Sequence, residues 1–342
     1  IPYTDELRWV GCKATNVQSW CQGRWNWLID GFEYSRVKAT VSRFPVDDSV
    51  YTAETTITVK NEEVSQPPNS AKRYSPGFLL PLILASLESV CPVLFEATSD
   101  IGQKTTEAVD GPTKDESDAI SFIARLCDKG VLSLCLMSLC SNCAGIRMFA
   151  LAILGNVLNI CHTQEAQKYS LWRDRPQVAM ILDSVQRFLL IQHPRQEAMS
   201  QLILAPPKLT PIVANFLARA AFAVSKPDDA LFAAMNKFFL KNESNHGAFG
   251  DWNRVPAFIS LFCPSTENPE TARLERLWAL QMLHDGVLDE SSYRLVAMCH
   301  GPELILSSLE NIFRSKFSST QKDMEYILVL QTVTVLLNIG GY

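Results

Sequence analysis

The sequence pattern of most of this 342-residue chain predicts a succession of amphipathic helices joined by short connections. Behind Pro176, apolar side chains recur every three or four positions and so share one helical face: Val178, Ile181, Leu182, Val185, Phe188 and Leu189. Segment 209–224 repeats this pattern, with Asn215 and Arg219 on its opposite, polar side. About a dozen such segments follow one another with almost no strand pattern, which predicts an all-α fold.

Local signals predict where several helices begin and end. Ser225 is expected to cap the start of a helix, with Asp228 in its first turn, and Asn268-Pro269-Glu270 to open another. Gly286 is expected to end that second helix in left-handed backbone, which costs glycine little. Further helix starts are predicted at Pro256, Pro302 and Thr320.

The spacing of the helices predicts their architecture. Helix pairs recur at about 40 residues, as in armadillo and HEAT arrays, where each pair buries its apolar face against its neighbours. The residues do not repeat cleanly, so we predict a degenerate armadillo/HEAT-like array over residues 74–342. A single irregular helical bundle is the alternative.

Residues 1–73 differ in character from the rest. Four tryptophans fall in the first 27 residues, namely Trp9, Trp20, Trp25 and Trp27, and apolar side chains alternate along 51–60 as in an extended segment. Residues 66–70 have the composition of a linker. We therefore predict an irregular, Trp-rich N-terminal arm packed against the helical domain. The first residue is Ile1, so we expect the chain to be a piece of a larger protein.

Two uncharged runs, Gly130–Ile146 and Met148–Gln164, are separated only by Arg147. Each is marginal in length for a membrane span, and polar residues are scattered through both. We interpret them as a buried pair of helices and predict no membrane association.

Residue patterns for chemistry are sparse. Nucleotide-binding glycine loops and the common hydrolase and kinase motifs are absent, which predicts a non-enzymatic protein without a cofactor. Cys140 and Cys143 form a lone CxxC, whereas a structural zinc site needs four ligands. The nearby Cys135 lies on an apolar helical face, so a zinc site is a less favoured alternative to a protein without metal. His284-Asp285 raises the remote alternative of an all-α HD-type metal phosphohydrolase. The scattered cysteines, without a disulfide framework, indicate a reducing compartment.

The net charge of −5 argues against a protein that binds nucleic acid over its whole surface. Residues 120–240, however, hold 12 Lys/Arg against 7 Asp/Glu. If this basic middle contacts RNA phosphates, the candidate residues are Lys168, Arg173 and Arg175. The alternative is that these basic residues lie on an ordinary solvent-exposed face and bind nothing.

Three consecutive stretches carry a resemblance to a known family: FLARAAFAVSKPDDALFAAMNKFFL (216–240), RVPAFISLF (254–262) and ERLWALQMLHDG (275–286). Shorter matching segments are Arg36–Pro45, Tyr74–Pro81, Lys129–Leu134 and Tyr293–Leu295. Together they resemble the C-terminal domain of the nucleolar pre-ribosomal-associated protein 1 family, very large helical-repeat scaffolds of early 60S subunit assembly.

The resemblance implies a nucleolar, non-enzymatic assembly factor that acts in pre-rRNA processing. Its implied partners are other pre-60S factors, including a DEAD-box helicase, in an environment of pre-rRNA and small nucleolar RNPs. Direct RNA contact by this segment is left open. The matching residues have structural roles: Leu277 and Trp278 are expected on the buried face, whereas Glu275 and Arg276 are either a solvated pair or an interface. A generic armadillo-like adaptor of another pathway is the alternative function.

Overall fold

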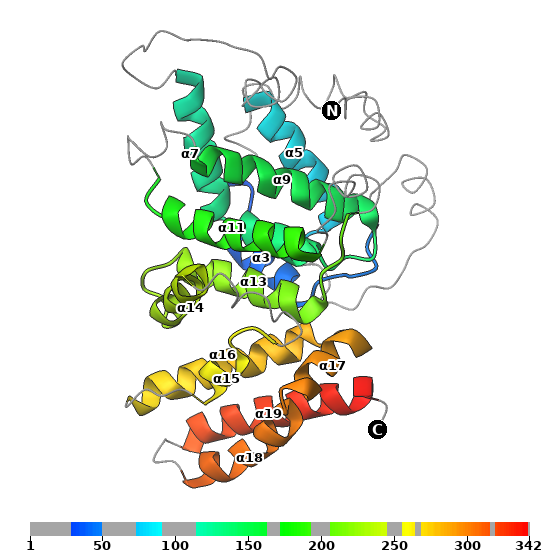
Figure 1. Ribbon diagram of the computed structural model, residues 1–342, viewed down its shortest axis with the longest axis vertical. Helices are drawn as coiled ribbons and strands as arrows, with labels where there is room; N and C mark the ends of the chain where they lie inside the picture. Colours follow the sequence, from blue (N-terminus) through cyan, green and yellow to red (C-terminus); the bar gives the residue numbers. More distant parts are fainter. Residues whose placement is uncertain are drawn as a thin grey trace. The chain divides into compact units, whose positions relative to one another are not determined.

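The computed structural model describes residues 29–49, 73–90, 114–162, 172–192, 206–244, 255–263, 268–314 and 319–340 (Figure 1). These residues form thirteen helices and contain no strand, which confirms the all-α prediction. In chain order the helices are α3 (Tyr34–Ser42), α5 (Pro76–Val90), α7 (Lys114–Asp128), α8 (Val131–Ser138), α9 (Ala144–His162), α11 (Arg175–Gln192), α13 (Pro211–Val224), α14 (Phe232–Ser244), α15 (Phe258–Phe262), α16 (Pro269–Gly286), α17 (Glu290–Met298), α18 (Gly301–Arg314) and α19 (Ser319–Gly340).

The chain divides into two compact units. Unit 1 comprises Ile1–Asp183 and Gln196–Pro207, and unit 2 comprises Ser184–Arg195 and Lys208–Tyr342, so the division falls within α11. This division separates two compact units, whereas the boundary predicted at residue 73 separates an arm from a helical domain. That boundary stays a prediction. The superhelical stacking of helix pairs also stays a prediction.

Helix α8 is the buried centre of unit 1. All eight of its residues are buried, and α3, α5, α7 and α9 pack against it. Gly130 connects α7 to α8 with a φ of 83°, a left-handed conformation that a side chain would make costly. Helices α8 and α9 thus form the buried pair expected from the two uncharged runs.

Part of the predicted irregular arm is helical and belongs to unit 1. Residues 34–42 form α3, which buries Val37, Thr40 and Val41. Beyond it, the backbone N of Asn142 donates to the carbonyl of Val46 at 2.8 Å. The prediction of irregular structure is therefore wrong for residues 34–42, which form a helix that packs on α8. The four tryptophans and the segment 51–60 lie outside the described residues.

By length and composition alone, two of the described helices could cross a membrane: Ala144–His162 and the Asp323–Gly340 part of α19. Half of the first is buried inside the structure, which is typical of a core helix. The second is 22% buried. Helix α19 buries one face, formed by Glu325, Val329, Thr332 and Leu336. Its exposed apolar side chains are Met324, Ile327, Leu330 and Leu337.

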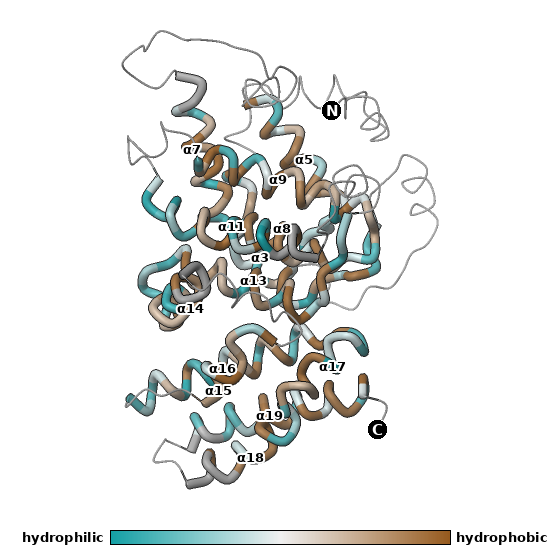
Figure 2. The backbone as a smooth tube through the Cα atoms, in the orientation of Figure 1, coloured by the Kyte–Doolittle hydropathy of each residue, from teal (hydrophilic) through white to brown (hydrophobic). Residues whose placement is uncertain are grey.

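Unit 2 is organised around α16, which packs against α13, α15 and α19. Helix α18 packs on α19, and α17 contacts both of them. In Figure 2, hydrophobic and hydrophilic stretches alternate along these helices, as expected when each buries one face.

The helix boundaries confirm some of the local predictions and correct others. Asn268 caps α16 by accepting hydrogen bonds from the backbone N of Glu270 and Thr271. Ser225 instead ends α13: its hydroxyl donates to the carbonyl of Ala221 at 2.7 Å, and α14 begins only at Phe232. Helix α15 likewise begins at Phe258 and not at Pro256, because the intervening Ala257 has a φ of 55°. Helices α18 and α19 begin next to the predicted Pro302 and Thr320.

Asp289 caps α17 in a way that makes its contribution depend on pH. Its Oδ1 accepts a 2.8 Å hydrogen bond from the backbone N of Ser292 and another from the Ser291 hydroxyl. Burial raises the pKa of this carboxyl, but the hydrogen bonds outweigh burial and hold the pKa below its ordinary value of 3.8. A depressed pKa stabilises the fold above the unfolded-state pKa, and this stabilisation is lost as pH falls through the folded-state pKa.

We therefore expect Asp289→Ala to lower the free energy of unfolding by about 1 kcal/mol near neutral pH. The difference from wild type should shrink as the pH falls below the folded-state pKa of Asp289. Urea unfolding of the whole chain at neutral and acidic pH measures it. Asp289→Asn is the control, because an amide keeps the cap without the charge. A loss in the alanine variant that is the same at both pH values would contradict the assigned role of the carboxylate.

Candidate functional site at helix α16

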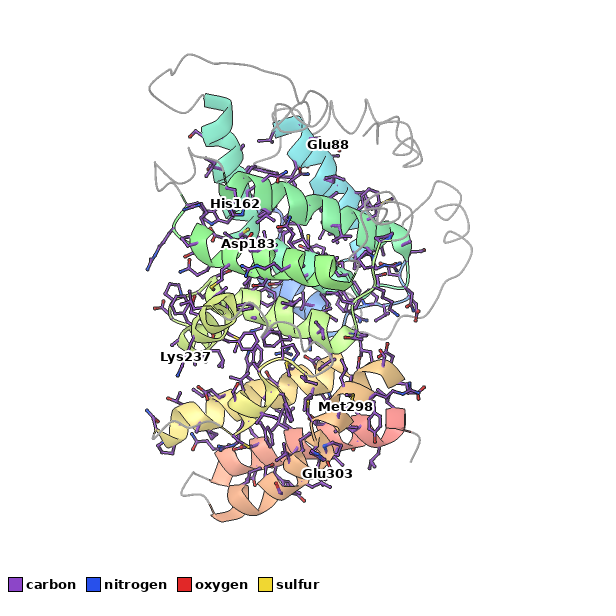
Figure 3. All side chains as sticks on the ribbon, viewed as in Figure 1. Glu88, His162, Asp183, Lys237, Met298 and Glu303 are labelled. Carbon is purple, nitrogen blue, oxygen red and sulfur yellow. The ribbon has the colours of Figure 1, made fainter. Side chains whose placement is uncertain are left out.

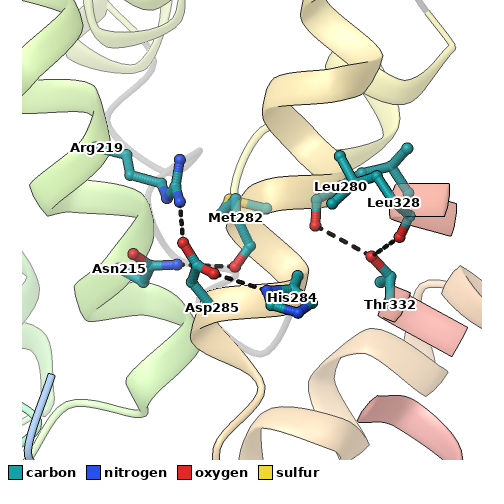
Figure 4. Close-up of polar contacts among 8 residues, drawn as sticks. All are labelled: Asn215, Arg219, Leu280, Met282, His284, Asp285, Leu328 and Thr332. Atoms are coloured by element: carbon teal, nitrogen blue, oxygen red, sulfur yellow. Dashed lines mark hydrogen bonds and ion pairs between the residues drawn. The ribbon is translucent and has the colours of Figure 1, made fainter. Parts of the chain in front are cut away.

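The junction between α13 and α16 contains a buried polar contact. Asn215, on α13, is fully buried, and its Nδ2 donates to the carbonyl of Met282 on α16 at 2.8 Å (Figure 4). The Oδ1 of the same amide is buried without a hydrogen-bond partner in the structure. A buried polar side chain at a helix contact favours one register of the two helices, because sliding them would leave its donors unpaired.

An ion pair lies one turn further along the same junction. Arg219, on α13, pairs through Nη2 with Oδ2 of Asp285 on α16, and the two side chains are only 12% and 15% exposed. Burial lowers the pKa of the Arg219 guanidinium, and the charge of Asp285 opposes this shift. The other carboxylate oxygen of Asp285 lies 2.7 Å from Nδ1 of His284. Figure 4 shows Asp285 joined to Arg219 on one side and to His284 on the other.

Gly286 has a different role from the one predicted. It is the last residue of α16, and it is not among the described residues with positive φ. A Cβ at this position would lie 2.9 Å from Nδ2 of Asn215 and 2.9 Å from Cδ1 of Ile212. The position therefore requires glycine because α13 approaches it closely, and not because the backbone is left-handed.

On its other side, α16 is tied to α19. Nε of Arg276 lies 3.1 Å from Oε1 of Glu325, a carboxylate whose side chain is only 2% exposed. The hydroxyl of Thr332 donates to the carbonyls of Leu328, at 2.8 Å, and Leu280, at 3.4 Å (Figure 4). Arg276 thus belongs to an interface between helices.

Glu275 is not the partner of Arg276. Burial raises the pKa of the Glu275 carboxyl, and Lys237 on α14 opposes that shift. The predicted burial of Leu277 and Trp278 is only partly correct, because both are half-buried, whereas Ala279 and Leu280 are buried. The Trp278 ring meets Phe216 of α13 edge-on at a centroid distance of 6.1 Å.

The two metal alternatives gain no support from the part of the chain that the structure describes. It contains no group of three or more His, Cys, Asp or Glu side chains that could hold a metal ion. Asp285 contacts both His284 and Arg219 of α13. Cys140 is buried and Cys143 is half-buried. Burial raises the pKa of the Cys161 thiol to about 12, which disfavours the thiolate that a metal would need.

The predicted phosphate contacts are only partly visible. Lys168 lies outside the described residues. Arg173 is exposed just before α11. Nη1 of Arg175 donates to the carbonyl of Cys161 at 2.6 Å, so this side chain caps the C-terminal end of α9. Nearby, Nε2 of His162 lies 3.1 Å from Oδ1 of Asp183 (Figure 3). RNA binding by Lys168, Arg173 and Arg175 stays a prediction.

Sequence reasoning missed the roles of Asn215 and Arg219. Their position opposite the apolar face of segment 209–224 predicts a polar side, yet Asn215 is fully buried and the Arg219 side chain is only 12% exposed. The available signal was their spacing of four residues, which places them on one helical face. A second signal was Asp285, a carboxylate in the last turn of the predicted helix that Gly286 ends.

The sequence of this region is similar to that of known proteins. The sequence model of a family described as nucleolar pre-ribosomal-associated protein 1 matches residues 132–336, more than half of the chain. The Homo sapiens protein of that name is 29% identical over 90 residues, which is 26% of this chain and 4% of the relative. The Mus musculus protein is 30% identical over 95 residues, 28% of this chain and 4% of the relative. No solved structure matches.

Proposed function

The chain belongs to the nucleolar pre-ribosomal-associated protein 1 family, and we propose that it is a non-enzymatic scaffold in the assembly of the 60S ribosomal subunit. The observation that carries the proposal is the family match over residues 132–336, which spans α8 to α19. The name shared by its curated relatives places the protein in the nucleolus and in ribosome biogenesis.

In unit 2, charged side chains join helices to one another, which supports the proposal of a scaffold. The matched segments 216–240 and 275–286 contribute Arg219, Arg276 and Asp285, and each of these forms an ion pair between helices. Charged residues of this kind could have marked a reaction centre. Here they hold helices together, which is what a protein that presents fixed surfaces needs.

The partners that fit the proposal are other pre-60S assembly factors, including a DEAD-box helicase, working on pre-rRNA among small nucleolar RNPs. The matched stretches are 4% of the length of the curated relatives, so the chain would supply a small part of a much larger set of surfaces. We propose that the helices of residues 74–342 stack as an armadillo/HEAT-like array that offers these surfaces.

Affinity purification of the tagged chain from cells, followed by analysis of the bound pre-rRNA and proteins, tests the function. We expect enrichment of large-subunit precursors over a tag-only control. Staining of the same cells for the tag should show the chain in the nucleolus. Precursors of the small subunit alone would contradict the 60S assignment. A cytoplasmic chain free of both precursors would favour the adaptor of another pathway. Metal-stimulated phosphatase activity that His284→Ala abolishes would contradict the non-enzymatic assignment.

A further inference from the structure

Three arginines lie in and beside α3 in unit 1. Arg36 belongs to the helix, and Arg43 follows it directly as the C-cap, with non-helical backbone. Nη1 of Arg73, which precedes α5, donates to the carbonyl of Arg43 at 3.1 Å. Arg43 and Arg73 are exposed, and Arg36 is half-buried. We call these three residues the α3 arginine strip.

The strip is held in place by neighbouring contacts. The guanidinium of Arg36 stacks over the Tyr74 ring, 4.4 Å from its centroid. Its Nε is buried and has no hydrogen-bond partner among the residues that the structure describes. The backbone N of Tyr74 donates to the hydroxyl of Thr40 at 2.9 Å. Tyr74 and Arg73 are thereby fixed against α3, so little conformational entropy remains to be lost when a ligand binds.

The aspartates near the strip have other hydrogen-bond or ion-pair partners. Asp30 pairs with Arg125, and Asp47 accepts a hydrogen bond from Asn142. Asp48 accepts hydrogen bonds from the hydroxyl of Ser75 and the backbone N of Gly77, at the start of α5. The remaining carboxylate of segment 29–49 is Glu33, the N-cap of α3, three positions before Arg36. Among the described residues, none of the three arginines forms an ion pair.

We propose that the α3 arginine strip binds the phosphate backbone of RNA. Guanidinium groups match phosphate geometry with paired hydrogen bonds, which favours arginine at such sites. From Arg36 to Arg43 the strip extends about 10 Å along the helix axis. A nucleic-acid strand carries a charge about every 3.4 Å, so several phosphates fit along this length. The choice of RNA over an acidic protein rests on the proposed function in ribosome assembly.

The test compares two double charge reversals in the whole chain. Arg43→Glu/Arg73→Glu changes the strip. Lys38→Glu/Arg187→Glu is the matched control, because both of its residues are exposed, and Lys38 is two positions from Arg36 and so faces away from it. The probes are a fluorescent oligouridylate, an RNA duplex and an oligoglutamate peptide. Binding is measured by anisotropy over a range of salt concentrations, with circular dichroism to confirm that each variant is folded.

We expect wild type and the control to bind at least one RNA probe, and the strip variant to bind it at least about tenfold more weakly. The dependence of log affinity on log salt should flatten by about 1.4 for a single strand, since two phosphate contacts are lost. The oligouridylate and the duplex distinguish single-stranded from helical RNA as the source of the phosphates.

Three results would overturn the proposal: no RNA binding by wild type, equal losses in the two variants, or preferential binding of oligoglutamate. None of them would affect the purification of ribosome precursors, which tests the proposed function. A chain that enriches large-subunit precursors while its folded strip variant binds RNA normally would refute this inference and leave the function intact.

Discussion

Asp285→Ala is expected to lower the free energy of unfolding of unit 2 by about 3 kcal/mol, because it leaves the Arg219 guanidinium buried without its counter-charge. His284 would lose the same partner, but it is more exposed, at 37%. The double variant Arg219→Met/Asp285→Ala should lose less than the single variant, since it removes both charges from the junction.

Amide hydrogen exchange of the whole chain measures the loss of stability locally, in α13 and α16. We expect peptides from α13 and α16 to lose protection in Asp285→Ala and to regain much of it in the double variant. Peptides from α8 and α9, in unit 1, serve as internal controls. Unchanged protection of α13 in the single variant would show that the ion pair contributes little to the junction.

The second large effect is expected at Gly286. Gly286→Ala adds a Cβ beside Asn215 and Ile212, and a contact of 2.9 Å forces the neighbouring atoms to move. Overpacking of this kind costs about 1–3 kcal/mol, and here it also strains the hydrogen bond from Asn215 to Met282.

Gly155→Ala is the matched control for Gly286→Ala. Gly155 lies within α9, and a Cβ there meets nothing within 4 Å. Alanine in a helix interior should stabilise the chain by about 0.5–1 kcal/mol relative to glycine. Urea unfolding of the two variants should therefore shift in opposite directions from wild type. A stabilising Gly286→Ala would refute the close approach of α13 to α16.

The features predicted correctly from sequence are those that local chemistry determines. Asn268 caps α16 because its side chain reaches backbone N–H groups only two and three residues away. The helical character of segment 209–224 follows from its own periodicity. Such signals involve contacts between near neighbours, so no knowledge of the tertiary fold is needed to interpret them.

The features that sequence could not supply depend on residues far apart in the chain. Asn215 and Met282 are 67 positions apart, and Arg276 and Glu325 are 49 apart. Helix α3 packs on α8, which lies far from it in the sequence. Gly286 was assigned to a backbone role because the sequence does not show that Asn215 lies against it.

We propose that the segment ending in His284-Asp285-Gly286 joins helices and does not perform chemistry. The most direct test is purification of tagged His284→Ala from cells, with its folding checked by circular dichroism. His284 is partly exposed and contributes no contact to α13 comparable to that of Asp285 with Arg219. We predict that the folded variant enriches large-subunit precursors as wild type does. A folded His284→Ala variant that loses these precursors would contradict the account.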